Sequence, residues 1–381
     1  MYYFDHAATS FPKPKRVIDS VVTTMEMHGA NPGRGGHSLS RQASELVLQT
    51  RQKIAAFFHA PSEEHVWFYP NATFALNQAI IGFPFSNGDE VVTTHFEHNS
   101  VLRPLYAMEK QAGIIIRFAG GKTGEETAAS VVEAINDKTK FVVINHASNV
   151  TGEIVPLTSI SEKAKSVGAI LCVDASQTAG TISINMERDG IDLLACPGHK
   201  GLLGPQGTGI LLSKHDYHLK PMTYGGTGHS SESKDQPIMW PERYEAGTLN
   251  TPAIAGLGAG IDELEYLGGT EAIYQHEVQL VDYFLREIAN VNVSLVGSET
   301  SEGRLAVVSF AFAELSSQEC AIILDQHYQI AVRAGLHCAP KLHEWFGSID
   351  KGLVRVSFGP YTTMNDVRVL IQAIKEIGAS F

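Results

Sequence analysis

The surroundings of Lys200 suit covalent chemistry. The lysine lies among small residues in the run CPGHKGLLGPQGTG, and an apolar run follows at residues 210–212. An amine that forms an imine with a carbonyl compound must lie on a tight loop that leaves it sterically accessible. Most lysines on turns are solvated surface charges, so Lys200 by itself leaves both interpretations open.

Asp174 adds weight to the covalent interpretation. It ends the apolar run AILCVD, upstream of Lys200. In open α/β sheets, ligands bind beyond the carboxyl ends of the strands, and an aspartate placed there could pair with a protonated ring nitrogen. Pyridoxal phosphate needs such a partner in order to accept electrons. The alternative is a helix N-cap, because Ser176 and Gln177 follow.

Two further stretches could bind an anion and a flat ring. At Asn71-Ala72-Thr73, backbone N–H groups and a hydroxyl would meet an anion at a helix start, although plain capping explains these residues equally well. His98 follows the run EVVTT. His95 and His98 could suggest a metal pair, but further ligands are missing at recognisable spacing. We therefore expect His98 to stack on a flat cofactor and to transfer protons.

Cys338 differs from the other three cysteines. Cys172, Cys196 and Cys320 lie in or beside apolar runs, which is typical of buried, unreactive thiols. Cys338 lies in the run RAGLHCAP, close to Arg333 and His337. Neighbouring cations favour the thiolate, so the turn predicts a nucleophile. An incidental loop cysteine is the alternative.

Alternating helix-like and strand-like patterns would position these residues. Strands are predicted at residues 66–69, 90–94, 114–118, 141–145 and 169–174, and helices at 41–58, 73–81, 100–111, 128–135 and 160–167. The runs FVVIN and AILCVD are apolar throughout, which is typical of strands buried on both faces. The pattern predicts β-α-β units and a mainly parallel sheet.

The character of the chain changes after residue 219. A stretch rich in Gly, Ser, Pro and charge runs to residue 250, and a loop of that length is usually functional. Long helical runs follow, and then strand and helix patterns alternate to the end. We expect a large α/β domain at residues 14–255 and a smaller α+β domain at residues 1–13 and 256–381.

Composition narrows the class of protein. The 381 residues carry 29 Lys and Arg against 41 Asp and Glu, a net charge of −12, which argues against nucleic-acid or anionic-membrane binding. No apolar run reaches the roughly 18 residues of a membrane helix, and no secretory signal is visible at the start. Four cysteines suit a reducing compartment, so we expect a cytoplasmic protein.

In this order, the motifs resemble those of the class V aminotransferases, and among them the cysteine desulfurases and selenocysteine lyases. The resemblance runs nearly from end to end, from FDHAAT at residues 4–9 to RVS at residues 355–357. It includes the Glu97-His98 pair and the runs SNVTG, DASQ, PGHK and EAGT. The run RAGLHC at residues 333–338 is similar to the SUF-type branch rather than the NIF-type branch.

The resemblance implies a fold-type I transferase that uses pyridoxal 5'-phosphate, with roles for named residues. Lys200 would bind the cofactor covalently, Asp174 would face its ring nitrogen, and His98 would stack on the ring. The implied cofactor-binding set is Ala72, Thr73, His98, Asn149, Asp174, Gln177, His199, Lys200 and Thr248, the last acting on a neighbouring subunit's cofactor. The substrate-binding set is Asn149, Arg333 and Arg355, and Cys338 would be catalytic together with Lys200, His98 and Asp174.

At two positions the sequence departs from the family's motifs, and both are expected to lie near the phosphate of the cofactor. Pro197 stands where the family has serine, and Ala72 where another hydroxyl residue is common. Phosphate contacts would then depend more on backbone amides, His199 and Thr73.

The expected function is the conversion of L-cysteine to L-alanine, with a persulfide on Cys338 for transfer to a protein sulfur acceptor, in a homodimer. Selenocysteine lyase activity, with L-selenocysteine as the substrate, is the nearest alternative. An aminotransferase or epimerase of the same fold would not need Cys338. A non-catalytic sulfur-carrier scaffold is disfavoured by the intact Asp174, His199 and Lys200.

Overall fold

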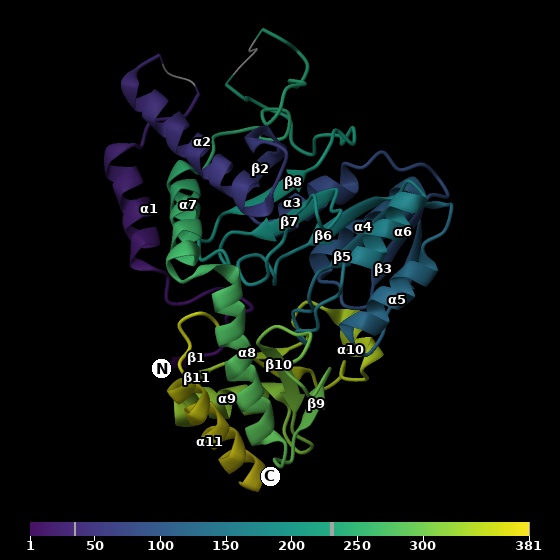
Figure 1. Cartoon of the computed structure of the whole chain (residues 1–381), viewed down its shortest axis with the longest axis vertical. Coiled ribbons are helices and arrows are strands. Elements are labelled where there is room, and N and C mark those ends of the chain that lie inside the picture. The colour runs from purple at the N-terminus through teal and green to yellow at the C-terminus, as the bar shows by residue number, and fades with distance from the viewer. Residues whose placement is uncertain (34–35, 229–231, 381) are drawn as a thin grey trace.

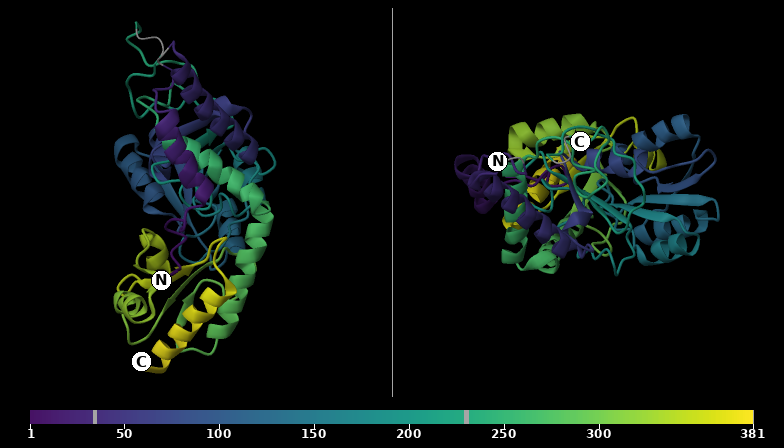
Figure 2. Two further views of the ribbon diagram at one scale, coloured as in Figure 1. Left: turned by 90° about the vertical axis from the view of Figure 1, so that its left-hand side faces the viewer. Right: turned by 90° about the horizontal axis from the view of Figure 1, so that it is seen from above.

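The structure is a computed structural model that describes residues 1–33, 36–228 and 232–380. Its upper part in Figure 1 contains a large sheet with helices on both faces, and its lower part contains a smaller sheet with long helices. Both chain ends lie in the lower part, as Figure 2 also shows from the side.

The large sheet has seven strands in the order β2-β8-β7-β6-β5-β3-β4. Only β8 runs antiparallel to its neighbours, β2 and β7, so the prediction of a mainly parallel sheet is confirmed. The strands are β2 (Val66–Tyr69), β3 (Glu90–Thr94), β4 (Ile115–Ala119), β5 (Thr139–Asn145), β6 (Ile170–Asp174), β7 (Leu193–Pro197) and β8 (Gly209–Ser213).

Helices cover both faces of this sheet. On one face pack α2 (Ser38–Phe58), α5 (Gly124–Ala134), α6 (Thr158–Ser166) and α7 (Thr251–Tyr266). On the other lie α3 (Ala72–Ile81) and α4 (Asn99–Ala112). A further helix, α1 (Lys15–Met27), packs against α7, and a short 3-10 turn occupies Glu63–His65.

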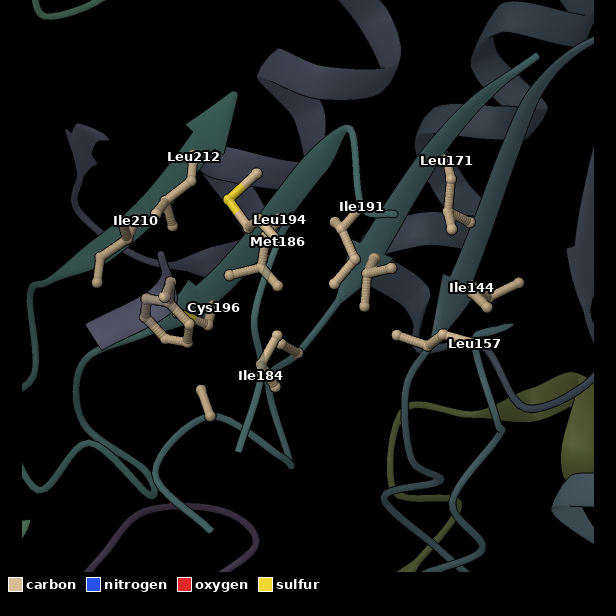
Figure 3. Close-up of a cluster of buried hydrophobic side chains, with 14 of the residues drawn as sticks. Ile144, Leu157, Leu171, Ile184, Met186, Ile191, Leu194, Cys196, Ile210 and Leu212 are labelled. Atoms are coloured by element: carbon tan, nitrogen blue, oxygen red, sulfur yellow. The ribbon is translucent and has the colours of Figure 1, made fainter. Parts of the chain in front are cut away.

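The central strands read as unbroken apolar runs because both of their faces are buried. Leu171 and Val173 of β6 face one core, while Cys172 between them faces the other. Figure 3 shows the first core, where Ile144, Leu171, Leu194 and Leu212 come from four neighbouring strands. Each such side chain contributes about 1.5–3 kcal/mol when fully buried, which keeps the strand ends in place for the site described below.

The second part of the chain has an antiparallel sheet in the order β12-β13-β10-β9. Its elements are α8 (Gly269–Ile288), β9 (Ser294–Val296), β10 (Val307–Ala311), α9 (Ser317–Tyr328), β11 (Ile330–Ala331), β12 (Arg333–Gly335), α10 (Pro340–Trp345), β13 (Leu353–Ser357) and α11 (Met364–Ser380). The first strand, β1 (Tyr2–Tyr3), pairs with β11, so the start of the chain joins this part.

The predicted elements that face the site are confirmed to within a few residues. The loop after residue 219 has no helix or strand among its described residues up to 250. A division of the chain near residue 255 stays a prediction, and α7 runs through that position while it packs on α1 and α2. Within the described ranges no helix is long and apolar enough to span a bilayer.

Candidate active site

A cavity of about 210 Å³ lies at the carboxyl ends of β5, β6 and β7. Parallel strands of an open α/β sheet place their ligand sites at this edge. Ten of the residues proposed from the sequence line this one cavity: Ala72, Thr73, His98, Asn149, Asp174, Gln177, His199, Lys200, Arg333 and Arg355. Cys338 and Thr248 are the two that do not line it.

Lys200 and Asp174 enter the cavity from adjacent strand ends, β7 and β6. Burial lowers the pKa of Lys200 to about 8, although the charge of Asp174 opposes that shift. Burial raises the pKa of Asp174, which is 2% exposed, against hydrogen bonds from Ser176. The Ser176 N–H and hydroxyl both donate to Asp174 Oδ1, and the N–H lies 2.9 Å away. Asp174 therefore makes a local turn and also faces the cavity.

The start of α3 presents polar groups to the same cavity. Asn71 caps the helix, because its Oδ1 accepts a hydrogen bond from the Phe74 N–H at 3.1 Å. The Thr73 hydroxyl lies 2.8 Å from that of Ser100, at the start of α4. Helix capping is thus observed at these residues, which also line the cavity, and their binding of an anion stays a prediction.

His98 is held in one orientation and in its neutral form. Its Nδ1 accepts a hydrogen bond from the Ser100 N–H at 3.0 Å and lies 2.9 Å from the Ser100 hydroxyl. Burial lowers the pKa of His98 to about 4, and the charges of Lys200 and Arg333 add to this effect. With Nδ1 as an acceptor, the ring proton belongs on Nε2.

His199 and Gln177 are tied to the start of the chain. His199 Nδ1 lies 3.1 Å from the Thr9 hydroxyl, and burial lowers the pKa of His199 to about 4. Gln177 Nε2 donates to the Ala7 carbonyl at 3.1 Å. Ala7 and Ala8 also line the cavity, so residues 1–13 contribute to its wall.

Arg355 and Asn149 form the opposite wall. Arg355 is 1% exposed; its Nη2 donates to Asp5 Oδ1 at 2.7 Å and its Nη1 to the Asn149 carbonyl at 2.9 Å. Asn149 Nδ2 donates to the His337 carbonyl at 2.8 Å. Arg355 Nε and Asn149 Oδ1 are buried without partners among the described residues. Buried polar atoms are rarely left unpaired in folded proteins, so a bound ligand is the natural partner.

Cys338 lies in a turn next to this wall, after β12. His337 and Cys338 have φ of 50° and 58°, a left-handed conformation that is costly for two consecutive non-glycine residues. The Asn99 N–H donates to the Cys338 carbonyl at 2.8 Å, and Arg333 Nη2 lies 3.9 Å from Cys338 Sγ. The guanidinium thus lies beside the thiol, as the sequence predicts, whereas burial lowers the pKa of His337 to about 2, so this histidine is not a second cation there.

The other three thiols are buried, as predicted. Burial raises the pKa of Cys172 and of Cys196, and raises that of Cys320 to about 12. His95, the second histidine of the discarded metal pair, stacks on Trp345 with ring centroids 4.6 Å apart. It does not line the cavity.

Thr248 lies in a separate groove with Phe74 and Tyr244. The resemblance assigns it to a neighbouring subunit's cofactor, and that assignment stays a prediction. Sequence reasoning missed several residues that line the cavity or support it: Asp5, Ser100, Asn145 and Ser176. The polar residue that ends the predicted strand 141–145 was the available signal for Asn145, and no local signal marked Asp5.

The donor set fits pyridoxal phosphate. A buried amine and a buried carboxyl face one cavity, which suits a carbonyl compound with a basic ring nitrogen. The N–H groups at the start of α3 and the Thr73 hydroxyl suit a phosphate. The unpaired Arg355 Nε suits the carboxylate of a small substrate.

Fold and cavity together define the class of fold-type I enzymes that depend on pyridoxal phosphate. The family model described as aminotransferase class-V matches residues 2–370. A probable cysteine desulfurase of Methanothermobacter thermautotrophicus is 31% identical over 98% of this chain and 94% of its own length. Another, of Halalkalibacterium halodurans, is 34% identical over 99% of this chain and 93% of its own.

A solved structure is similar over the whole chain. The apo structure of a cysteine desulfurase from Thermococcus onnurineus NA1 has a TM-score of 0.92 and 32% sequence identity, and the match covers 100% of this chain and 95% of that one. The chain belongs to the class-V aminotransferase family.

Proposed function

We propose that the protein is a cysteine desulfurase that converts L-cysteine to L-alanine and leaves a persulfide on Cys338. The observation that carries this proposal is the position of Cys338: a strained turn holds the thiol beside Arg333, next to a cavity that contains Lys200 and Asp174. The cysteine desulfurases that match nearly the whole chain support the same activity.

The residues of the cavity divide the chemistry between them. Pyridoxal phosphate, the cofactor of the class, supplies a conjugated ring that accepts electrons from the substrate's α-carbon. Lys200 anchors the cofactor and then removes the α-proton, a task for which an amine with a pKa of about 8 is suited. Asp174 holds a proton at the ring nitrogen, and Arg355 and Asn149 bind the substrate carboxylate.

Sulfur transfer then falls to Cys338. Its thiolate attacks the sulfur of the substrate, so a new S–S bond forms while the Cβ–S bond breaks. The electron pair of the broken bond stays with the carbon skeleton, which takes up protons and leaves as alanine. No external oxidant or reductant is needed, because the enzyme's thiol becomes a persulfide as the substrate's carbon is reduced. His98, with its proton on Nε2, is the proposed proton carrier near the leaving sulfur.

The test compares Cys338→Ala with Cys320→Ala, which removes a buried thiol elsewhere. With L-cysteine, Cys338→Ala should still bind cofactor and still change its absorbance, but should lose alanine formation and persulfide labelling. Cys320→Ala should keep both. Retained selenide release from L-selenocysteine by Cys338→Ala would favour the lyase alternative. Desulfuration of L-cysteine at the wild-type rate would contradict the proposal.

The proposal extends to partners and location. A homodimer is proposed because Thr248 lies outside its own chain's cavity, in a separate groove that a second copy would cover. A protein that accepts the persulfide sulfur, for uses such as iron-sulfur cluster assembly, would complete the cycle. The four free cysteines support a reducing, cytoplasmic location.

A further inference from the structure

Several donors from one short segment converge on the carbonyl oxygen of His199. The Ser10 N–H lies 3.1 Å from this oxygen, and the Ser10 and Thr9 hydroxyls lie 3.1 and 3.0 Å from it. The Lys13 amine is nearer still, at 2.7 Å. These donors exceed the two lone pairs of a carbonyl oxygen and compete for them, and the Lys13 amine, the nearest and the only charged one of the four, makes the strongest bond.

Lys13 is the charged member of this group. Its amine also donates to the Ser10 hydroxyl at 2.7 Å, and no carboxylate among the described residues forms an ion pair with it. Burial lowers the pKa of Lys13 to about 8. Moving an ammonium group partly out of water without a counter-ion is costly, and a charge-assisted bond to a carbonyl recovers part of that cost.

The position of the His199 oxygen determines where Lys200 begins. The His199 carbonyl and the Lys200 N–H belong to one planar peptide unit, so fixing the oxygen also fixes the nitrogen and Cα of Lys200. The rest of the loop is closed by its own bonds: Leu203 N–H donates to the Lys200 carbonyl at 2.9 Å, and Gly204 N–H to the Gly198 carbonyl at 2.8 Å.

We propose that Lys13 is a positioning residue for Lys200: its bond to the His199 carbonyl fixes the peptide from which the reactive amine extends. The inference rests on the role proposed above for Lys200. A displacement of about 1 Å in a reacting group costs on the order of 100-fold in rate, so a residue that touches no substrate can still set turnover.

The test uses the cofactor-loaded enzyme with Lys13→Met, which removes the donor and keeps the chain length close. Lys13→Gln keeps a neutral donor, and Lys15→Met is the matched control, since Lys15 forms only a surface pair with Asp19. We expect Lys13→Met to lower kcat per loaded site by about 10- to 100-fold with KM for L-cysteine within about twofold. Lys13→Gln should fall between this variant and wild type, and Lys15→Met should match wild type.

Amide hydrogen exchange gives a readout that needs no activity. Exchange at Leu203 and Gly204 should be faster in Lys13→Met and unchanged in Lys15→Met. If Lys13 only stabilised the fold, Lys13→Met would lower the melting temperature and leave kcat per loaded site unchanged. That result would overturn the proposal. If Lys13→Met does not fold, Lys13→Gln with wild-type kcat and exchange overturns it equally. Failure of the desulfurase proposal would show separately, as wild-type enzyme that releases no alanine from L-cysteine.

Discussion

Asp174 has two roles: its side chain stabilises a local turn, and its carboxylate faces the cavity. One substitution can remove the second role and keep the first. Asp174→Asn keeps an oxygen for the Ser176 N–H but removes the negative charge. We expect the cofactor to remain bound, and kcat to fall by at least about 100-fold, because nothing would hold the proton on the ring nitrogen. Steady-state kinetics on cofactor-loaded protein measure this. A loss of only a few-fold would make Asp174 a cap and nothing more.

Arg355 uses two of its nitrogens within the protein, and this geometry predicts how it binds substrate. Lysine at this position would keep the charge but could not contact Asp5 and the Asn149 carbonyl while also binding a carboxylate. Arg355→Lys should therefore raise KM for L-cysteine by about 10- to 100-fold, the value of one charged hydrogen bond. An unchanged KM would place the carboxylate elsewhere.

Glu277 on α8 predicts a pH-dependent stability. It is 6% exposed and lines a small second cavity that Lys200 also borders. Its side chain makes no hydrogen bond among the described residues. Burial raises its pKa to about 8 from an ordinary value of 4.5. The folded protein keeps this proton over a range in which the unfolded chain loses it, so stability falls as pH rises from about 4.5 to about 8.

The substitution Glu277→Gln should remove this loss of stability at higher pH, because glutamine does not ionise. Its melting temperature should exceed that of the wild type by a margin that grows from pH 5 to pH 8, towards a difference on the order of 4 kcal/mol in unfolding free energy. An exposed control, Glu302→Gln, should show no such trend. A margin that does not change with pH would mean that Glu277 ionises normally in the folded protein.

At the residue scale, the sequence was informative where chemistry coincided with a local pattern. Asp174 ends a predicted buried strand, and Lys200 lies in a glycine-rich loop that precedes an apolar run, so both could be predicted. Asp5 could not, because its role comes from a bond to Arg355, 350 residues away, beside a bridge from Asp5 to Ser357 that no local pattern specifies. Ser100 was not predicted for a related reason: its hydroxyl lies within hydrogen-bonding distance of both Thr73 and His98, which only the folded structure shows.

Strand β8 lies close to the start of α3, and adding one methyl group at Gly209 tests whether this contact positions the 71–73 turn. A Cβ on Gly209 would lie 2.2 Å from the Asn71 carbonyl carbon, which no real contact allows. Gly209→Ala should push the 71–73 turn away from the cavity and weaken cofactor binding by about 10-fold or more, with about 1–3 kcal/mol of overpacking cost. Gly225→Ala, whose Cβ would meet only Ala246 at 3.8 Å, is the control. Equal cofactor dissociation constants would show that the turn does not carry the phosphate.

At the element scale, β7 and α1 are among the elements that were not predicted. Strand β7 has the sequence LLACP, short and ended by proline beside the lysine loop, so it read as part of that loop. Helix α1 has the sequence KRVIDSVVTTMEM, whose β-branched residues disfavour a helix in isolation. Packing against α7 stabilises this helix, which its intrinsic helix propensity alone would not do.

At the scale of the whole molecule, the proposed dimer makes a complementation prediction. Lys200→Ala removes the anchor from a chain's own cavity, whereas Thr248→Ala alters the groove proposed to face a second copy. When the two variants are mixed and allowed to exchange subunits, mixed dimers should contain one site with both residues intact. Activity should then recover to as much as about a quarter of the wild-type value, if half of the dimers are mixed.

Each variant alone supplies the control, and Lys200→Ala should be inactive. A mixture whose activity never exceeds the sum of its components would contradict a site shared between subunits. Measuring recovery against protein concentration also gives the strength of the association.

The pairing of β1 with β11 and the ion pair between Asp5 and Arg355 have a consequence for synthesis on the ribosome. The wall of the cavity needs both residues 5–13 and Arg355, and Asp5 leaves the exit tunnel 350 residues before Arg355. A nascent chain can form much of the large sheet, yet it cannot close the site until Arg355 has emerged. The site is therefore completed only after β13 has been made, and a chain truncated before this strand would never become a competent apoenzyme.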